Sequence, residues 1–165
     1  MIFIVAKKGP HLQTHSMSEI IVTLTKQRSQ NMASIDTVEG IGPTYKDKLK
    51  AADIATVEKL REAGAQPSGR KQIADQTGID EKMILEWVNR VDLMRIKGVG
   101  EEYSDLLECA GVDTVVELAT RNSDNLAAKM EELNEEKKLV RVVPSAEKVA
   151  DWVAQAKDLP RGVHY

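Results

Sequence analysis

The stretch Gly40-Ile41-Gly42 holds the residues whose types and spacing are best suited to chemistry, and that chemistry is anion binding. Glycines on both sides of an apolar residue allow positive φ angles and let a ligand approach the backbone closely. A helix that begins directly after them offers free N–H groups and a dipole to an anion such as phosphate. A hydroxyl and two lysines on one helix face would add to this attraction. The predicted anion site consists of Gly40, Ile41, Gly42, Thr44, Lys46 and Lys50.

The same turn recurs 58 residues later, as Gly98-Val99-Gly100. Nine of the 21 residues from 40 to 60 are identical to their counterparts in 98–118, where average composition predicts about one. Glu101 and Glu102 follow the second turn, and acidic side chains at a helix N-terminus satisfy its dipole and repel phosphate. The second turn, with Gly98, Val99, Gly100, Glu101 and Glu102, is therefore expected to be structural or to contact a basic protein partner.

No set of residues in the expected core is suited to catalysis or to metal binding. His11, His15 and His164 fall in segments expected to be tails, so no histidine is placed beside a carboxylate and a nucleophile. Cys109 is the only cysteine and is expected to be a small core residue. The sequence therefore predicts that the protein is not an enzyme and has no catalytic residue, metal, cofactor or small-molecule substrate.

From Ile35 onward, the apolar residues have the spacing of helices, which predicts an all-α fold. Pro43 suits the first turn of a helix, and capping residues mark the starts of others. Trp87 and Trp152 lie on apolar stripes and are expected to anchor the core, whereas Arg70 and Lys71 are expected to be exposed and basic. The expected capping residues are Thr56, Ser68, Asp80, Thr114, Asn122 and Ser145.

The duplication predicts two tandem repeats, residues 34–93 and 94–165, each a small bundle of four to five short helices. Residues 1–33 resemble neither repeat and are expected to be a tail that is disordered or not native. Met32, directly before the first repeat, is then a candidate for the natural start of the chain.

Composition is that of a soluble globular protein, with 42% apolar and 30% charged residues. No apolar run approaches the ~18 residues that span a membrane, and the start does not have the order of a signal peptide. With a single cysteine, the protein is expected to be cytoplasmic. The net charge of −3 is uneven: it is +3 over residues 1–35, −2 over 36–93 and −4 over 94–165. Both repeats are therefore acidic, which counts against a broad basic surface for nucleic acid.

The pattern apolar-x-Gly-apolar-Gly followed by an amphipathic helix resembles the helix-hairpin-helix motif at residues 35–54 and 93–112. The span from about residue 34 to 165, with its "IKGVGEEY" and "ADWV" segments, resembles a bacterial family of tandem-hairpin proteins classed as a domain of unknown function, of the DUF4332 type. In DNA-binding members of the motif class, the turn holds a backbone phosphate and does not read base sequence. The resemblance implies a fold but no defined activity.

Two functions stay open. The first is weak, sequence-independent DNA binding through the first turn. The alternative is a protein–protein interaction or scaffolding module whose turns are purely structural. DNA binding requires the helix face with Lys46 and Lys50 to be free. On this interpretation Gly42→Val should disturb local folding, while the double variant K46E/K50E should fold and lose DNA affinity.

Overall fold

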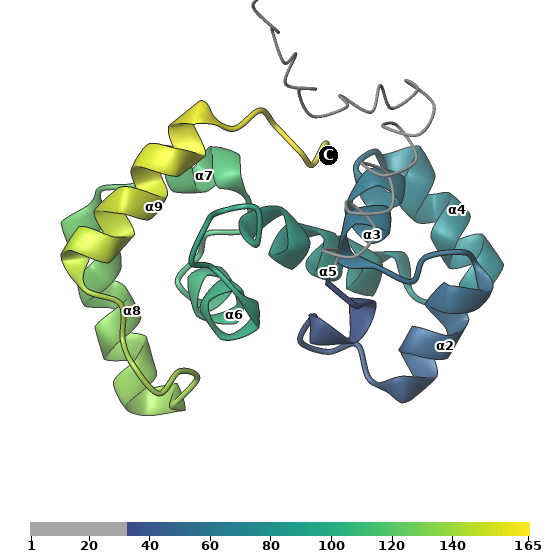
Figure 1. Cartoon of the computed structure of the whole chain (residues 1–165), viewed down its shortest axis with the longest axis horizontal. Coiled ribbons are helices and arrows are strands. Elements are labelled where there is room, and N and C mark those ends of the chain that lie inside the picture. The colour runs from purple at the N-terminus through teal and green to yellow at the C-terminus, as the bar shows by residue number, and fades with distance from the viewer. Residues whose placement is uncertain (1–32) are drawn as a thin grey trace, which may run out of the picture. The chain divides into compact units, whose positions relative to one another are not determined.

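The structure, a computed structural model, describes residues 33–165, which form one compact unit. These residues contain a short 3-10 helix, η1 (Ile35–Thr37), eight α-helices and no strand, so the predicted all-α fold is confirmed (Figure 1). None of these helices is both long and apolar enough to cross a membrane. The predicted N-terminal tail, with His11, His15 and the candidate start at Met32, lies outside the described residues apart from Ala33.

The helices fall into two consecutive groups, which we call the first and second bundles. The first bundle holds η1, α2 (Pro43–Ala51), α3 (Val57–Gly64), α4 (Pro67–Thr77) and α5 (Glu81–Leu93). The second bundle holds α6 (Glu101–Cys109), α7 (Val115–Ala119), α8 (Ser123–Lys137) and α9 (Ala146–Asp158). The repeat boundary between residues 93 and 94 stays a prediction, because helix ends alone do not delimit a repeat.

Helix starts follow the capping chemistry of the sequence at most positions. Pro43 is the first residue of α2, as predicted, because its missing N–H has no helical acceptor there. Ser68 is an exception: α4 begins at Pro67 after Gln66, and the capping role predicted for Ser68 is wrong. The residues that do accept a hydrogen bond from a first-turn N–H are Thr56, Asp80, Thr114, Asn122 and Ser145.

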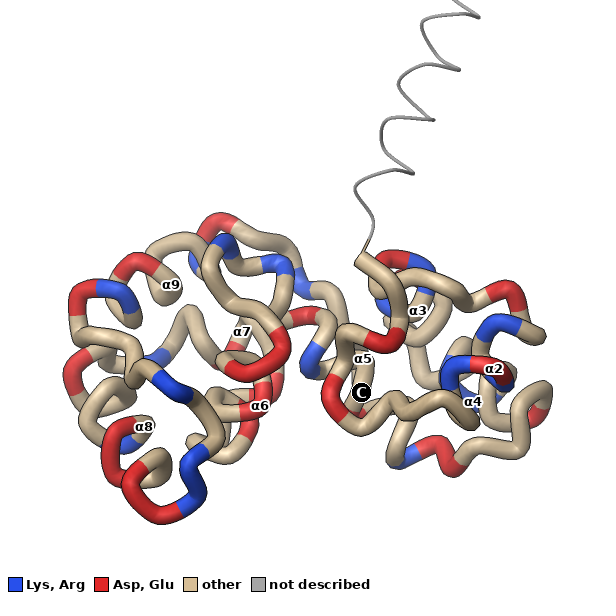
Figure 2. Tube along the Cα trace, turned by 60° about the horizontal axis from the view of Figure 1, so that its bottom comes forward, with Lys and Arg blue, Asp and Glu red and all other residues tan. Residues whose placement is uncertain are grey.

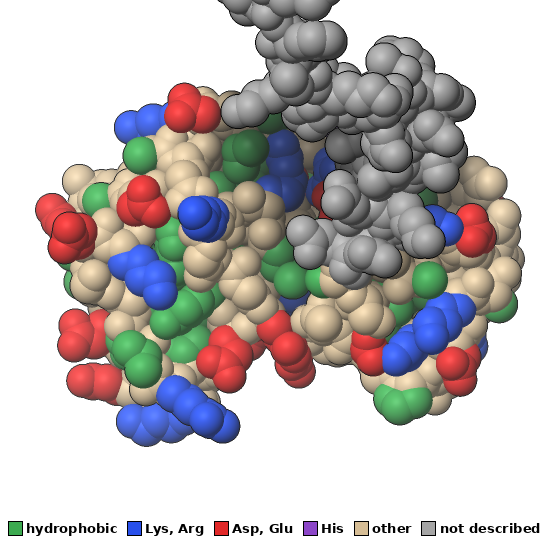
Figure 3. All heavy atoms as spheres, in the orientation of Figure 1, with side chains coloured by type: hydrophobic (Ala, Val, Ile, Leu, Met, Phe, Trp, Pro, Cys, Tyr) green, Lys and Arg blue, Asp and Glu red, His purple; other side chains and the backbone are tan. Residues whose placement is uncertain are grey.

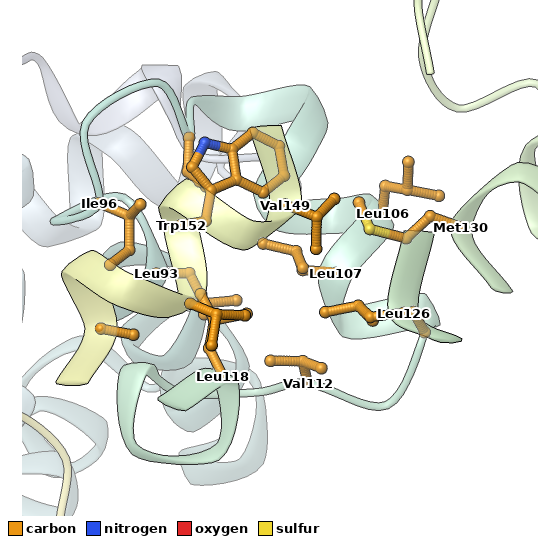
Figure 4. Close-up of a cluster of buried hydrophobic side chains, with 14 of the residues drawn as sticks. Leu93, Ile96, Leu106, Leu107, Val112, Leu118, Leu126, Met130, Val149 and Trp152 are labelled. Atoms are coloured by element: carbon orange, nitrogen blue, oxygen red, sulfur yellow. The ribbon is translucent and has the colours of Figure 1, made fainter. Parts of the chain in front are cut away.

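Each bundle encloses its own cluster of buried apolar side chains. In the second bundle, Leu107, Val149 and Trp152 surround the same interior (Figure 4). Trp87 and Trp152 are only 2% and 1% exposed, so the prediction that they anchor the core is confirmed. Cys109 is half-buried, and its Sγ lies 3.9 Å from Lys137 Nζ, so it is not the full core residue that was predicted.

Residues 159–165, which we call the C-terminal strap, return from α9 to the first bundle (Figure 1). Val163 is buried in the first cluster, and the His164 N–H donates to the Ala65 carbonyl at 2.9 Å. His164 therefore belongs to the folded unit, and its predicted placement in a tail is wrong.

Candidate functional site

The two Gly-x-Gly turns have matching backbone geometry. In the first, Gly40 has φ +87°, and the buried Ile41 donates its N–H to the Val38 carbonyl at 3.0 Å. A positive φ favours glycine because any side chain would crowd the backbone there. The second turn repeats these features at Gly98, Val99 and Ile96.

The first glycine of each turn also packs against a tryptophan. A Cβ on Gly40 would lie 3.1 Å from Trp87 Nε1, and the Trp87 ring lies 5.2 Å from the Tyr45 ring. The absence of a side chain thus lets the turn approach the last helix of its bundle. In the second bundle the corresponding residues are Gly98, Trp152 and Tyr103, with the same 5.2 Å between rings.

The second glycine of each turn does not have the positive φ that the sequence predicts. Gly42 and Gly100 have φ −77° and −108°, and a Cβ on either would have no neighbour within 4 Å. The prediction that both glycines use positive φ is wrong. The predicted effect of Gly42→Val on folding therefore loses its steric basis, and Gly42 simply leaves the start of α2 open.

In each bundle, a side chain of the last helix forms hydrogen bonds with the backbone of the residue that directly precedes the Gly-x-Gly turn. Arg90 Nη1 donates to the Glu39 carbonyl at 2.8 Å. Gln155, 65 residues later, donates to the Lys97 carbonyl at 3.3 Å and accepts from the Lys97 N–H at 2.9 Å. Sequence reasoning missed both residues because arginine and glutamine are not similar. Their separation of 65 residues, the same as that of the two tryptophans, was the available signal.

The N-terminus of α2 has no capping side chain, whereas most of the other α-helices have one. Gly42 supplies no capping side chain, and the first helical turn of α2 contains no acidic residue. Gly42, Pro43 and Thr44 are exposed. Pro43 has no N–H, and the N–H of Thr44, like other first-turn N–H groups, has no acceptor within the helix. This helix start can accept an anion without displacing a side chain.

The lysines beside this start do not behave alike. Lys46 forms an ion pair with Asp36, and this contact lowers the pKa of Asp36 from 3.8 to about 2. The free helix face that DNA binding requires is therefore only partly present, because Asp36, ten positions earlier in the chain, already binds Lys46. Lys50 is exposed and has no carboxylate within 4.0 Å anywhere in residues 33–165.

Arg70 is not the exposed basic residue that the sequence predicts. Its side chain is buried, and it donates to the Gly64 carbonyl at 2.9 Å and to the His164 carbonyl at 2.8 Å. The predicted exposure of Arg70 is wrong, whereas Lys71 is exposed and lies 3.5 Å from Asp75. On the part of the face in Figure 3 that grey atoms leave uncovered, acidic and basic side chains are interspersed.

The second turn precedes an acidic helix (Figure 2). Glu101 and Glu102 are exposed in its first turn, and partial desolvation together with the nearby Glu39 raises the pKa of Glu101. The two turns are therefore neighbours, with carboxylates between them. Farther along α6, Asp105 and Glu108 lie 3.2 and 2.5 Å from Arg90 of the first bundle.

Within the described part of the chain, no three side chains of His, Cys, Asp or Glu are grouped so as to hold a metal ion. Of the three histidines, His164 lies in that part, and its backbone pairs with Ala65 and Arg70.

No curated protein and no solved structure matches the chain. A protein family does match it, over residues 39–159, and its description is "Domain of unknown function (DUF4332)". This span includes both Gly-x-Gly turns and all eight α-helices. Since the match covers most of the 165 residues, the chain belongs to the DUF4332 family.

Proposed function

We propose that the protein is a cytoplasmic, non-enzymatic module of the helix-hairpin-helix kind that holds a nucleic-acid backbone phosphate at the N-terminus of α2. Binding is weak and independent of base sequence. The observation that carries this proposal is a difference between two otherwise matching helix starts. Both α2 and α6 begin after an exposed glycine with no capping side chain, but the first helical turn of α2 has no acid, whereas that of α6 holds Glu101 and Glu102.

The phosphate would meet backbone N–H groups of the first turn, the Thr44 hydroxyl and the Lys50 ammonium group. Lys46 contributes less, because Asp36 offsets its charge. With one or two cations in contact, the logarithm of the binding constant should fall with the logarithm of salt concentration with a slope of about −1 to −2.

The sharpest test replaces Thr44 by the residue that the second turn has in the same place. Thr44→Glu puts a carboxylate into the first turn of α2, where Glu102 stands in α6. We expect DNA affinity, measured by fluorescence anisotropy at low salt, to fall at least about tenfold through like-charge repulsion. The fold should remain, because a carboxylate near a helix N-terminus is favourable.

Glu102→Thr is the matched control and should not weaken binding. Equal affinities of the wild type and Thr44→Glu would rule out the first turn as the binding site. Absence of any binding by the wild type at low salt would refute nucleic-acid binding itself.

A second experiment tests the lysine. Lys50→Glu should reduce DNA affinity, while Lys82→Glu, an equal change of charge at an exposed site in α5, should have a smaller effect. The double variant K46E/K50E is less informative, because a glutamate at position 46 would lie beside Asp36 and disturb a native ion pair.

A protein–protein interaction or scaffolding role is the second candidate, and the carboxylates between the two turns favour it. Glu39, Glu101 and Glu102 are exposed close to one another and suit a basic protein segment. A lysine-rich peptide that binds the wild type, but not Glu101→Gln/Glu102→Gln, would support this role. Equal binding to both would contradict it.

A further inference from the structure

The two bundles do not share a hydrophobic core. Their clusters of buried apolar residues have no member in common, although α5 contributes Val91 to the first and Leu93 to the second. A common core would fix the bundles through many side chains at once. Here their relative position depends on α5, on a few polar contacts and on the C-terminal strap.

The strap is anchored to both bundles. Leu159 packs against the second cluster, and Val163, 1% exposed, is buried in the first. The His164 backbone pairs with the α3–α4 junction, donating to Ala65 and accepting from the buried Arg70. At the end of the strap, the Tyr165 hydroxyl donates to Asn89 Oδ1 of α5 at 3.2 Å.

The middle of the strap crosses an ion pair between Asp92 and Arg95, whose carboxylate is buried where the bundles meet. Asp92 is 0% exposed, lies 2.8 Å from Arg95, and accepts from the Val115 N–H of α7 at 2.9 Å. Arg95 also donates to the Pro160 carbonyl at 2.9 Å. A Cβ on Gly162 would clash with both Asp92 Oδ1 and Arg95 Nη1, so only glycine lets the strap pass this closely.

We propose that the C-terminal strap is a clamp that holds the two bundles as one rigid body, and that its displacement lets the first bundle move about the end of α5. The strap is suited to reversible release. Pro160 and Arg161 are exposed, Tyr165 is 65% exposed, and Val163 is the single side chain that it buries in the first cluster. With the strap displaced, α5 would keep two polar contacts to the second bundle: Arg90 with Asp105 and Glu108, and Asp92 with the Val115 N–H.

The experiment measures the distance between the bundles in the full chain. Spin labels are attached at Gln72→Cys in α4 and Glu132→Cys in α8, both exposed, in a background with Cys109→Ser. Double electron–electron resonance should give one narrow distribution of distances between the two labels in this chain. Val163→Asp removes the buried anchor of the strap and should broaden the distribution severalfold while helix content remains that of the parent.

Val142→Asp is the matched control, since Val142 is 69% exposed in the second bundle, and its distribution should stay narrow. A narrow distribution for a fully helical Val163→Asp chain would overturn the clamp. If Val163→Asp loses helix content, the same distance measurement on Gly162→Ala tests the clamp. A broadened distribution in that variant supports the clamp, and a narrow one overturns it.

Discussion

At the residue scale, two glycines in one turn serve different purposes. Gly40 has a positive φ and faces Trp87, so the fold itself requires glycine there. Gly42 has an extended backbone and an open neighbourhood, so the fold does not require it. A glycine that the core does not need, at an exposed helix start, is consistent with close approach of a ligand to the backbone.

This difference predicts unequal effects of the same substitution. Gly40→Ala should reduce the free energy of unfolding by about 2 kcal/mol, because alanine must adopt a left-handed conformation beside Trp87. Gly42→Ala should cost less than about 1 kcal/mol, the usual effect of a weaker N-cap residue. Urea denaturation of the two variants measures the difference, and equal losses would contradict it.

Arg90 illustrates a residue whose role depends on partners far away in sequence. Arg90→Gln should cost about 2 kcal/mol, because it leaves Asp105 and Glu108, with side chains only 20% and 22% exposed, without their cation. Lys71→Gln is the control: its pair with Asp75 is 70% and 68% exposed and should contribute less than about 0.5 kcal/mol. Thermal denaturation of the two variants tests this, and similar midpoints would contradict it.

At the element scale, the ends of α2 and α6 show how the two copies differ. A residue with left-handed backbone follows each helix two positions after its last residue: Asp53 with φ +63° after α2 and Gly111 with φ +84° after α6. Glycine adopts this conformation without strain and aspartate adopts it at some cost. The second copy thus ends its hairpin helix with less backbone strain.

Exchanging these residues tests that conclusion. Gly111→Asp should lower the free energy of unfolding by about 1 kcal/mol, because it introduces a side chain at positive φ. Asp53→Gly should leave stability unchanged or higher, since the ion pair of Asp53 with Lys59 is largely exposed. Chemical denaturation distinguishes the two, and a loss at Asp53→Gly larger than that at Gly111→Asp would refute the assignment of strain.

At the scale of the whole molecule, several carboxyl groups set the pH dependence of stability. Desolvation raises the pKa of Glu101, Glu108 and Asp113, all in the second bundle. A carboxyl group with a higher pKa in the folded state binds its proton more tightly there. Its effect on stability therefore becomes more favourable as pH falls towards that pKa, and less favourable as pH rises through it. Asp36 behaves oppositely: its contribution is present above its usual pKa of 3.8 and is lost as pH falls through about 2.

The melting temperature should therefore be higher near pH 4.5, the usual pKa of glutamate, than at neutral pH, and should fall again in strong acid. Melting curves from pH 2 to 8 test this. Glu101→Gln should reduce the increase between neutral pH and pH 4.5, because it removes one of the groups that titrate. A melting temperature that rises steadily up to neutral pH would contradict the prediction.

Much of the fold could be predicted from local patterns. The spacing of apolar residues indicated helices from Ile35 onward, and proline and capping residues located most helix starts. Trp87 and Trp152 were identified as core residues for the same reason. These features depend on residues within a few positions of one another, and a single sequence contains that information in full.

Only the tertiary structure decided which charges are free. Lys46 binds Asp36 across the turn, Arg70 is buried under the strap, and Arg90 joins the two bundles. A long side chain reaches several ångströms from its helix, so its partner is set by how the helices pack and not by spacing along the chain. For this reason one lysine of the predicted anion site, Lys46, is already paired, and Arg70 is not the exposed basic residue that was predicted. The open start of α2, a local feature set by Gly42 and Pro43, remained.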